Sequence, residues 1–497
     1  MGLNMQFDLD PKVCSLLGRL QTFFAQKGCR GYLVGGFPRD LILGRPARDI
    51  DIAVEGNITA ISHELAHELN AKPISLDSDN DVVRLVFLGP KDNGWQIDLS
   101  AICDDLTADL KRRDFTINAL ALDLATASWG VPGTMDIALI DPLDGLADIK
   151  ARVLRATGNE VFKQDAIRLL RAIRLASELG FTIDNVTEAR ISHDADLIRQ
   201  EAGERVREEL LRLLKLTGTD EVLFRMHKLN LVTAIFPELV PSVGLTQRNE
   251  HQWDVFEHSI HSVTALDFLL RCDDWPYTKA TALDDIPWNE FLADHFRTPL
   301  SPISTRRELV KLAALLHDVA KPQTRTVAPN GRLRFYGHPQ EGGIIVEKIL
   351  ERLRFSTKEK KLVSAVVRHH LRPVQICENG ALPTKRATYR LVRDLGEATI
   401  DTLFFSLADH LATRGTKLDL TNWRYHANIV ACVLSESARV ADVTLKGLID
   451  GHDLQRELGL KPGVRMGEIL SELREAQAAG EISSRDEAVR YVKRLLP

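Results

Sequence analysis

GYLVGGFPRDLILGRPARDIDIAVEG, at residues 31–56, contains the pattern that decides the fold of the N-terminal part of the chain. The apolar run at residues 31–34 predicts a strand, and Gly35 and Gly36 follow it directly before the start of a predicted helix. Glycine lets the backbone approach a ligand closely, and the free N–H groups at a helix start attract anions. The strand, the glycine turn and the helix together predict a site for phosphate groups.

Two aspartates mark the second predicted strand of this stretch. Asp49 and Asp51 are two residues apart, so on a strand their side chains lie on one face, while Ile50 and Ile52 lie on the other. Carboxylates at this separation can hold a pair of Mg²⁺ ions about 3.5–4 Å apart. Asp98, in a third predicted strand, is the candidate for completing this acidic cluster, although a solvated surface position explains Asp98 equally well.

The periodicity of apolar residues changes near residue 140. Before it, short β-rich runs alternate with helical stretches, and after it nearly all periodicity is helical. The predicted strands are residues 31–34, 50–54, 82–87 and 95–100, and the predicted helices include residues 58–69, 168–179, 204–214, 307–316, 343–353 and 467–478. Residues 271–305 lack a clear period and are predicted to form an inserted loop or hairpin outside the core.

The composition excludes several classes of protein. A net charge of −5 over 497 residues argues against a protein that coats nucleic acid, so any contact with RNA must come from local basic patches. Candidate patches are Lys111, Arg112 and Arg113; Arg168, Arg171 and Arg174; and Lys358, Lys360 and Lys361, the last of which is more readily explained as a solvated helix face. No signal peptide or membrane-spanning run is present, which predicts a cytoplasmic protein. The six cysteines form no CxxC pair, so the sequence predicts neither a disulfide framework nor a zinc knuckle.

A third pattern lies at residues 162–181, FKQDAIRLLRAIRLASELGF. Asp165, Arg168 and Arg171 recur at spacings of three, so one face of a helix is predicted to carry an acceptor and two forked donors. Such a face can pair with the Watson–Crick edge of a base. The structural alternative is an i to i+3 salt bridge between Asp165 and Arg168.

The run G-G-x-x-R-D followed by D-x-D resembles the head domain of the class II tRNA nucleotidyltransferase and bacterial poly(A) polymerase family, within the DNA polymerase β-like superfamily. This resemblance implies an α+β fold, in which a polymerase β-like head with a mixed sheet and helices is followed by all-α neck, HD and tail domains. The implied boundaries are residues 1–140 for the nucleotidyltransferase head, 141–250 for the helical neck, 251–412 for the HD domain and 413–497 for the helical, RNA-binding tail.

The resemblance also implies roles for individual residues. The run KRRDFTINA, at residues 111–119, resembles the family element that recognises the ribose, and residues 162–181 resemble the element that reads the incoming base without a template. The implied catalytic acids are Asp49, Asp51 and Asp98, and the implied nucleotide-binding residues are Gly35, Gly36, Arg39, Arg113, Asp114, Asn118, Asp165, Arg168, Arg171 and Arg174. The chain departs from the family pattern at Gln164, where the family has glutamate, and at Pro38.

A second set of candidate metal-binding residues lies between residues 251 and 410, in an order that resembles the HD phosphohydrolase superfamily. The set is His258, His317, Asp318, His338, His369 or the adjacent His370, and Asp409, and of the adjacent pair we predict His369 as the ligand. The set exceeds what a single ion requires, so it predicts a dinuclear site for a divalent metal of undetermined identity, suited to phosphoester hydrolysis. The isolated histidines His251, His261 and His410 are interpreted as packed or surface side chains.

The function that the resemblance implies is Mg²⁺-dependent addition of CCA to the 3′ end of tRNA, from CTP and ATP. A poly(A)-adding enzyme, or one that adds only CC or only A, shares the head motifs and remains an alternative. A metal-dependent phosphohydrolase whose head only recognises nucleotide is an alternative of a different class. An RNA-binding protein without catalysis would require both acidic centres to be accidental.

Overall fold

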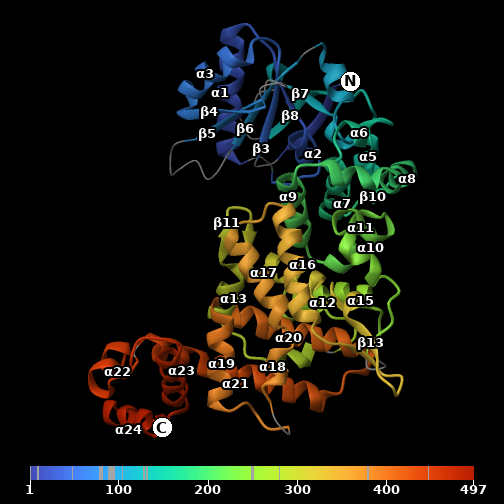
Figure 1. The fold of residues 1–497 in the computed structure, drawn as a ribbon. Helices are drawn as coiled ribbons and strands as arrows, with labels where there is room; N and C mark the ends of the chain where they lie inside the picture. Colours follow the sequence, from blue (N-terminus) through green and yellow to red (C-terminus); the bar gives the residue numbers. More distant parts are fainter. Residues whose placement is uncertain are drawn as a thin grey trace. The chain divides into compact units, whose positions relative to one another are not determined.

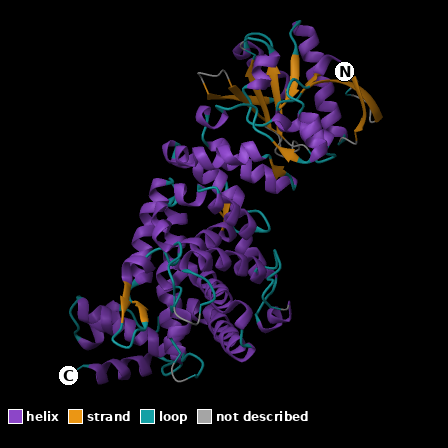
Figure 2. Cartoon of the chain, turned by 90° about the vertical axis from the view of Figure 1, so that its right-hand side faces the viewer, coloured by secondary structure: helices purple, strands orange, loops and turns teal. Residues whose placement is uncertain are grey.

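A computed structural model of the chain divides into two compact units, residues 1–200 and 201–497. It describes residues 2–7, 10–46, 49–77, 82–87, 96–102, 104–126, 129, 133–247, 251–278, 280–377, 380–445 and 447–496, so that Trp95 and Cys103 lie outside the described residues. Strands gather in the first unit, whereas the second is almost wholly helical (Figures 1 and 2). The α+β fold class predicted from the sequence is confirmed. The division at residue 200 falls within the segment that was assigned to the neck.

The first unit is built on a mixed sheet with the strand order β1-β8-β7-β2-β3-β6-β5-β4. The strands are β1 (Gly2–Phe7), β2 (Gly31–Val34), β3 (Asp49–Val54), β4 (Ala71–Asp77), β5 (Val82–Phe87), β6 (Gln96–Ala101), β7 (Ala121–Asp123) and β8 (Gly133–Ile140). Neighbouring strands are antiparallel except β3 and β6, which are parallel and place Asp51 opposite Asp98. The acid-bearing strand therefore lies inside the sheet, with a partner on each side.

Helices cover this sheet and continue the chain beyond it. They are α1 (Pro11–Lys27), α2 (Gly36–Ile42), α3 (Ile58–Leu69), α4 (Leu106–Lys111), α5 (Gly145–Ala151), α6 (Val161–Gln164), α7 (Ile167–Leu179) and α8 (Asn185–Asp194), with the short strands β9 (Val153–Leu154) and β10 (Thr182–Ile183). Helix α3 has the predicted bounds and packs against β4, β5 and β6. Helix α7 ends at Gly180, whose φ of 64° is the left-handed conformation that favours glycine.

The second unit consists of helices with two short hairpins. Its helices are α9 (Gly203–Leu214), α10 (Thr219–Lys228), α11 (Leu231–Ile235), α12 (Val255–Leu269), α13 (Glu290–Arg297), α14 (Arg306–Leu316), α15 (Lys321–Thr324), α16 (His338–Arg352), α17 (Thr357–His369), α18 (Arg372–Gln375), α19 (Lys385–Leu395), α20 (Thr399–Arg414), α21 (Leu420–Leu445), α22 (Gly451–Leu458), α23 (Val464–Ala479) and α24 (Arg485–Leu495). The hairpins are β11 (Pro299–Ser301) with β12 (Ser304–Thr305), and β13 (Arg325–Val327) with β14 (Leu333–Phe335).

The centre of this unit is formed by α12, α14, α17 and α20, which pack against one another, with α16 packed on α17. Capping boxes define the starts of two of these helices: Thr305 with Glu308 begins α14, and Ser356 with Glu359 begins α17. The apolar positions of α14 are fully buried up to Leu316, so the helix carries His317, at its C-terminal cap, into the interior. The sequence folds here so that polar residues at helix ends meet inside an apolar shell.

Residues 271–305 contribute to the core, so the prediction that they lie outside it is wrong. The segment contains the predicted hairpin, β11 with β12, but also the helix α13, which was not predicted. Trp275, Leu292 and Phe296 are buried, and the Phe296 ring lies 5.1 Å from that of Phe404 on α20. The sequence pattern did not reveal these buried apolar residues because polar residues and prolines separate them.

The last three helices form a small core of their own. Leu454, Ile469, Leu473 and Val492 are buried within it. Arginines of α19 contact this subdomain by ion pairs, which are Arg386 with Glu481 and Arg390 and Arg393 with Glu475. In the described part of the chain, no helix combines the length and the apolar character needed to cross a membrane.

Candidate functional site

The paired aspartates of the first unit lie as the strand pattern predicts. Ile50 and Ile52 are fully buried, whereas Asp49 is exposed and Asp51 is partly buried on the opposite face. Asp98 is next to Asp51 in the register of β3 and β6, so three acids gather on one face of these strands. Both carboxylate oxygens of Asp98 already accept hydrogen bonds from Arg84, at 2.7 Å each.

The glycine turn lies against Asp51. Gly35 has a φ of 71°, and a Cβ added there would lie 2.5 Å from Asp51 Oδ2 and 3.3 Å from Arg113 Nη1. Only a residue without a side chain leaves this space open. Arg113 donates from Nη2 to Asp109, at 3.2 Å, and its Nε is buried with no hydrogen bond among the described residues. The turn, the acid and the Arg113 guanidinium therefore meet at one place.

Burial raises the pKa of Asp51 to about 6, because Arg113 only partly offsets the loss of hydration and the negative charges of Asp98 and Asp49 add to it. A carboxylate held in this way gains most from a nearby cation. The acid pair and the open space at Gly35 therefore fit a divalent metal such as Mg²⁺, which takes oxygen ligands.

Asp51→Asn is expected to raise the melting temperature of the metal-free protein, and to raise it more at pH 7.5 than at pH 5. An unfolded Asp has a pKa of about 3.9, whereas folded Asp51 has a pKa of about 6, so between these values only the folded protein holds the proton. Stability therefore falls as the pH rises through this window, and the cost of the buried charge is fully present above it. Melting curves at both pH values measure the gain, expected to reach roughly 1 kcal/mol at pH 7.5. Asp49→Asn, at the exposed position, is the control; an equal gain for Asp51→Asn at both pH values would contradict the prediction.

A chain of polar contacts connects the glycine turn to α7. Arg39 donates from Nη1 to Asn118 Oδ1, at 2.6 Å, and Asn118 donates from Nδ2 to Asp114 Oδ1, at 2.9 Å. Arg171 on α7 donates from Nε and Nη2 to Asp114 Oδ2, at 3.1 and 2.8 Å. Burial opposes ionisation of Asp114, but the charge of Arg171 and the hydrogen bond from Asn118 outweigh it and lower its pKa. Asp114, predicted to lie beside the ribose, is thus buried with both oxygens engaged inside the protein, where it positions Arg171 and Asn118.

The structure differs from the predicted base-reading helix face at one residue, Asp165. Asp165 has an extended backbone after the end of α6, and α7 begins at Ile167, so Asp165 does not share a regular helix face with the arginines. Its Oδ1 accepts a hydrogen bond from the backbone N–H of Ile167, at 3.2 Å, and Arg168 Nε lies 3.9 Å from its Oδ2. The alternative salt bridge is therefore present as a loose pair. Arg174 is buried and donates to Glu178, at 2.9 Å.

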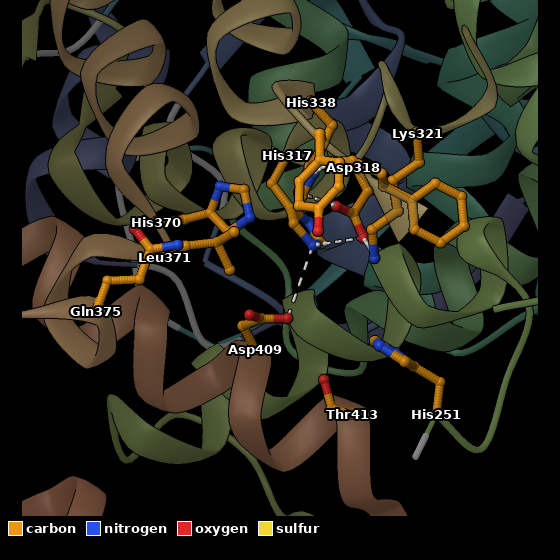
Figure 3. Close-up of a pocket in the computed structure, with 12 residues that line it drawn as sticks. His251, His317, Asp318, Lys321, His338, His370, Leu371, Gln375, Asp409 and Thr413 are labelled. Atoms are coloured by element: carbon orange, nitrogen blue, oxygen red, sulfur yellow. Dashed lines mark hydrogen bonds and ion pairs between the residues drawn. The ribbon is translucent and has the colours of Figure 1, made fainter. Parts of the chain in front are cut away.

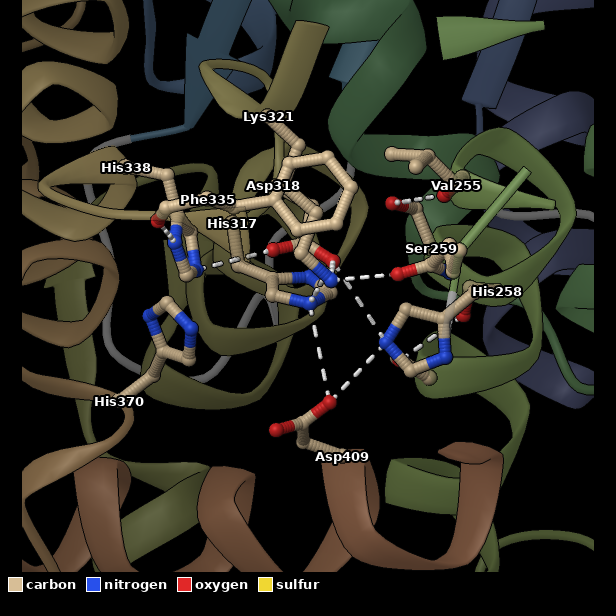
Figure 4. A network of polar contacts seen from close by, with 12 residues as sticks. Val255, His258, Ser259, His317, Asp318, Lys321, Phe335, His338, His370 and Asp409 are labelled. Atoms are coloured by element: carbon tan, nitrogen blue, oxygen red, sulfur yellow. Dashed lines mark hydrogen bonds and ion pairs between the residues drawn. The ribbon is translucent and has the colours of Figure 1, made fainter. Parts of the chain in front are cut away.

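The second unit contains a buried group of histidines and aspartates, here called the His–Asp cluster. Its members are His258 on α12, His317 and Asp318 after α14, His338 at the start of α16, His370 after α17 and Asp409 on α20. Asp318 is shared by two groups, one with His258 and His317 and one with His338 and His370, and within each group the ligand atoms lie within 4.8 Å of one another. Figures 3 and 4 show these side chains converging around Asp318 and Asp409. Two overlapping groups with a shared carboxylate suit a pair of metal ions.

Hydrogen bonds to the backbone fix the tautomers of three rings. His317 donates from Nδ1 to Ala314 O at 2.8 Å, His338 to Phe335 O at 2.7 Å, and His370 to Val367 O at 2.8 Å. In the neutral ring, Nε2 is then a lone-pair acceptor. This is the arrangement that metal-binding histidines have.

The Nε2 atoms of His317 and His338 face the carboxylate of Asp318. His317 Nε2 lies 3.0 Å from Asp318 Oδ2, and His338 Nε2, which is buried with no hydrogen bond among the described residues, lies 3.4 Å from Asp318 Oδ1. Burial lowers the pKa of His370 to about 3 and lowers that of His338, which keeps these two rings neutral. Burial also opposes protonation of His317, but the carboxylates of Asp318 and Asp409 outweigh it and raise the pKa of this ring. Burial disfavours the charged form of Asp318, but the neighbouring His317 and Lys321 outweigh it and hold its pKa well below its usual range. The residues of the cluster therefore fit a divalent metal.

His370, and not the predicted His369, belongs to the cluster. The His370 ring lies 5.1 Å from that of His317 and 5.3 Å from that of His338, and it lines the cavity beside the cluster. His369 is absent from the described lining of that cavity. The signal was in the sequence, because Val363, Val367 and His370 are spaced by four and three and share the buried face of α17.

Sequence reasoning also missed two residues of this cavity, which has a volume of about 350 Å³. His251, interpreted as a packed or surface residue, lines it. Lys321 lines it too, and its Nζ lies 2.6 Å from Asp318 Oδ2 and 2.6 Å from Gln247 Oε1 (Figure 3). Lysine is not a metal ligand, so a pattern of metal-binding residues in the sequence does not point to Lys321.

Family models match three parts of the chain. A model of the poly A polymerase head domain matches residues 31–155. A model described as the probable RNA and SrmB-binding site of polymerase A matches residues 180–242, and a model of the HD domain matches residues 289–414.

Whole-chain relatives extend these matches. The A-adding tRNA nucleotidyltransferase of Deinococcus radiodurans is 31% identical over 471 residues, which cover 93% of this chain and 94% of the relative. The CC-adding tRNA nucleotidyltransferase of Thermus thermophilus is 31% identical over 464 residues, which cover 92% of this chain and 91% of the relative. The structure of a Thermotoga maritima CCA-adding enzyme complexed with tRNA has a similar fold, with a TM-score of 0.61 at 21% identity, covering 98% of this chain and 97% of that one.

Proposed function

Because the chain belongs to the tRNA nucleotidyltransferase family, we propose that it adds the sequence CCA to the 3′ end of tRNA, from CTP and ATP. The observation that carries this proposal is the acid pair Asp49 and Asp51, with Asp98 beside it in register and the Gly35 turn against Asp51. The match of residues 180–242 to an RNA-binding model supports RNA as the acceptor.

The head residues would act mainly by positioning. Asp49 and Asp51 would hold Mg²⁺, which when bound neutralises charge on the triphosphate and on the attacking 3′ hydroxyl. The Gly35 turn would let the backbone approach the triphosphate, and the Arg113 guanidinium, whose Nη1 lies beside the turn, would add positive charge near the bound nucleotide. Arg39 lies beside the turn, because its Nη2 is 3.2 Å from where a Cβ of Gly36 would be.

Selection of the base would depend on α7. Arg171 is held by Asp114, and Arg168 lies one helical turn before it with Asp165 nearby. Forked donors fixed in this way can pair with the edge of a base. This supports selection of CTP and ATP by the protein itself, without a template.

A second candidate, addition of only CC or only A, is favoured by one observation. The two whole-chain relatives with 31% identity are an A-adding and a CC-adding enzyme. The experiment that separates these functions uses tRNA transcripts ending before CCA, after C and after CC, with CTP and ATP supplied singly and together. Ordered addition of C, C and A supports the proposal, one partial step supports the second candidate, and no extension of any transcript refutes both.

For the second unit we propose a divalent-metal phosphohydrolase site formed by the His–Asp cluster. Its support is the pair of ligand groups that share Asp318, with the Nε2 atoms of His317 and His338 facing that carboxylate. Bound metal would supply an activated water for attack on phosphorus. Lys321 would neutralise charge on the phosphate, since its Nζ lies at the edge of the cluster.

Gly35→Ala is expected to lower nucleotide addition by about 100-fold, because a new methyl group 2.5 Å from Asp51 Oδ2 must displace that carboxylate. The matched control is Gly44→Ala. Gly44 has a φ of 64° but nothing within 4 Å of an added Cβ, so it carries the backbone strain without the clash. Primer-extension rates of the two variants measure the difference, and equal rates would show that the contact with Asp51 does not matter.

A further inference from the structure

The second unit contains another cavity, here called the lysine cavity, which is separate from that of the His–Asp cluster. It has a volume of about 340 Å³ and shares no described lining residue with the cavity of the cluster. Its walls come from β11, the start of α14, the first half of α17, and the end of α19 with the turn Gly396–Ala398 that leads into α20. The lysine cavity therefore lies between elements that pack at the centre of the unit.

Two lysines of α17 face this cavity. Lys358 and Lys361 are three residues apart, so they lie on one side of the helix, and both line the cavity, whereas Lys360 does not. Both are exposed, and neither makes an ion pair with any residue that the structure describes. The lysine run is thus more than a uniformly solvated helix face, because two of its members share a cavity wall.

A guanidinium with unused donors adds to this positive charge. The Arg306 side chain is 10% exposed, and its Nη1 donates to Asp401 Oδ2, at 2.5 Å, and to Glu397 O, at 3.1 Å. Its Nε and Nη2 make no hydrogen bond within the described part of the chain, and Arg306 lines the cavity. Asp401 is fully buried, so it fixes the planar fork of the guanidinium in one orientation. Glu397 also lines the cavity, and among the described residues its carboxylate pairs with neither lysine.

The rest of the lining is apolar. Leu362 and Leu395 are buried, and Leu300 and Ala365 are partly buried. The described lining has no aromatic ring and no histidine, cysteine, serine or threonine, so it offers neither a stacking surface nor the usual nucleophiles. A volume of about 340 Å³ lies within the range of small-molecule sites. The cavity is therefore suited to binding and not to a chemical step.

An anion with an aliphatic part would use all of these groups. Two ammonium groups and the unused donors of a fixed guanidinium suit a doubly charged phosphate. Inorganic phosphate would leave the leucines unused, and a nucleotide would find no ring on which to stack its base. RNA is a second source of phosphate, but an extended backbone is bound along a groove or a surface, whereas these groups line a closed-in cavity of small-molecule size.

We propose that the lysine cavity binds a small organic phosphate with an aliphatic body. The phosphate lies between Lys358, Lys361 and Arg306, and the aliphatic part lies against Leu362 and Leu395. This inference goes beyond both proposed activities and rests on neither. Because the walls come from several helices, the bound ligand joins α14, α17 and the segment before α20, and it stabilises the folded unit by binding to it.

The test measures binding of n-butylphosphonate to the full chain by calorimetry. EDTA is present, so that the probe cannot bind through metal ions at the head or at the His–Asp cluster. Inorganic phosphate is the probe without an aliphatic part. Filter binding of a tRNA transcript in Mg²⁺ tests RNA as the other source of phosphate.

Four proteins are compared. They are the wild type, the double variant Lys358→Ala with Lys361→Ala, the matched control Lys360→Ala, and Ala365→Leu, which narrows the cavity without changing its charge. Arg306 is kept in all of them, because its loss would leave Asp401 buried without a cation. Melting temperatures show that each variant is folded.

We expect the wild type to bind n-butylphosphonate at least about fivefold more tightly than inorganic phosphate, because the butyl group leaves water. The double variant should bind the phosphonate at least about tenfold more weakly, and Ala365→Leu at least about fivefold more weakly. Lys360→Ala should bind it as the wild type does, and all four proteins should bind tRNA equally. The inference is overturned if the wild type does not bind the phosphonate, if Lys360→Ala weakens binding as much as the double variant, or if the double variant loses affinity for tRNA alone.

Discussion

Asp51→Ala is expected to lower the rate of nucleotide addition by at least about 1000-fold, with the fold intact. Asp51 lies against the Gly35 turn and next to Asp98 in register, so its loss removes a carboxylate from the centre of the proposed metal site. Asp98 is engaged by Arg84 through both oxygens. The measurement is single-turnover addition of one nucleotide to a tRNA transcript at saturating Mg²⁺.

Two comparisons make this result specific. Asp196→Ala removes an 81% exposed carboxylate of the same unit and should retain the wild-type rate. Melting temperature and circular dichroism show whether Asp51→Ala is folded. A folded Asp51→Ala protein that keeps more than a tenth of the wild-type rate would remove Asp51 from the proposed mechanism.

Asp318→Asn is expected to abolish metal binding by the second unit and to lower its phosphoester hydrolysis by at least about 100-fold, while nucleotide addition persists. Asp318 belongs to both ligand groups, so losing one charged oxygen weakens both at once. Metal retained after dialysis and hydrolysis of p-nitrophenyl phosphate measure the effect. Asparagine keeps the volume of the buried side chain, which limits damage to the fold.

The adjacent histidines provide the matched control. His370→Ala should lower metal retention and hydrolysis, whereas His369→Ala should change neither, although the two positions are neighbours in sequence. His370 is buried against His317 and His338, and His369 is outside the cavity lining. If both substitutions had the same effect, or if Asp318→Asn retained its metal, the cluster would not be the site of metal binding.

The local sequence pattern was sufficient to predict the acid pair and the helix that leads to His317 of the His–Asp cluster. On a strand, the alternation of Asp49, Ile50, Asp51 and Ile52 places the two aspartates on one face and the two isoleucines on the other. The structure has this arrangement. The apolar helix before His317 likewise ends where its period predicts. In both places a residue's environment is decided by neighbours within one turn or one strand.

Contacts between residues that are far apart in the sequence could not be predicted in the same way. Nothing local places Asp51 beside Asp98, because register is set by the whole sheet. The engagement of Asp114 by Arg171 joins residues 57 positions apart. Asp165 leaves the helical pattern because its side chain accepts the N–H of Ile167, a choice that spacing alone does not encode. These contacts decide which polar residues remain available to a ligand.

The chain of contacts from Arg39 through Asn118 and Asp114 to Arg171 restricts how base preference could be redesigned. An engineer who replaces Arg171 with a shorter residue removes the cation that keeps Asp114 ionised, and leaves a buried carboxylate without compensation. The damage would then reach Arg39 and the turn through Asn118. Variants with altered nucleotide choice should therefore be sought as paired substitutions at Arg171 and Asp114, in libraries that vary both positions together.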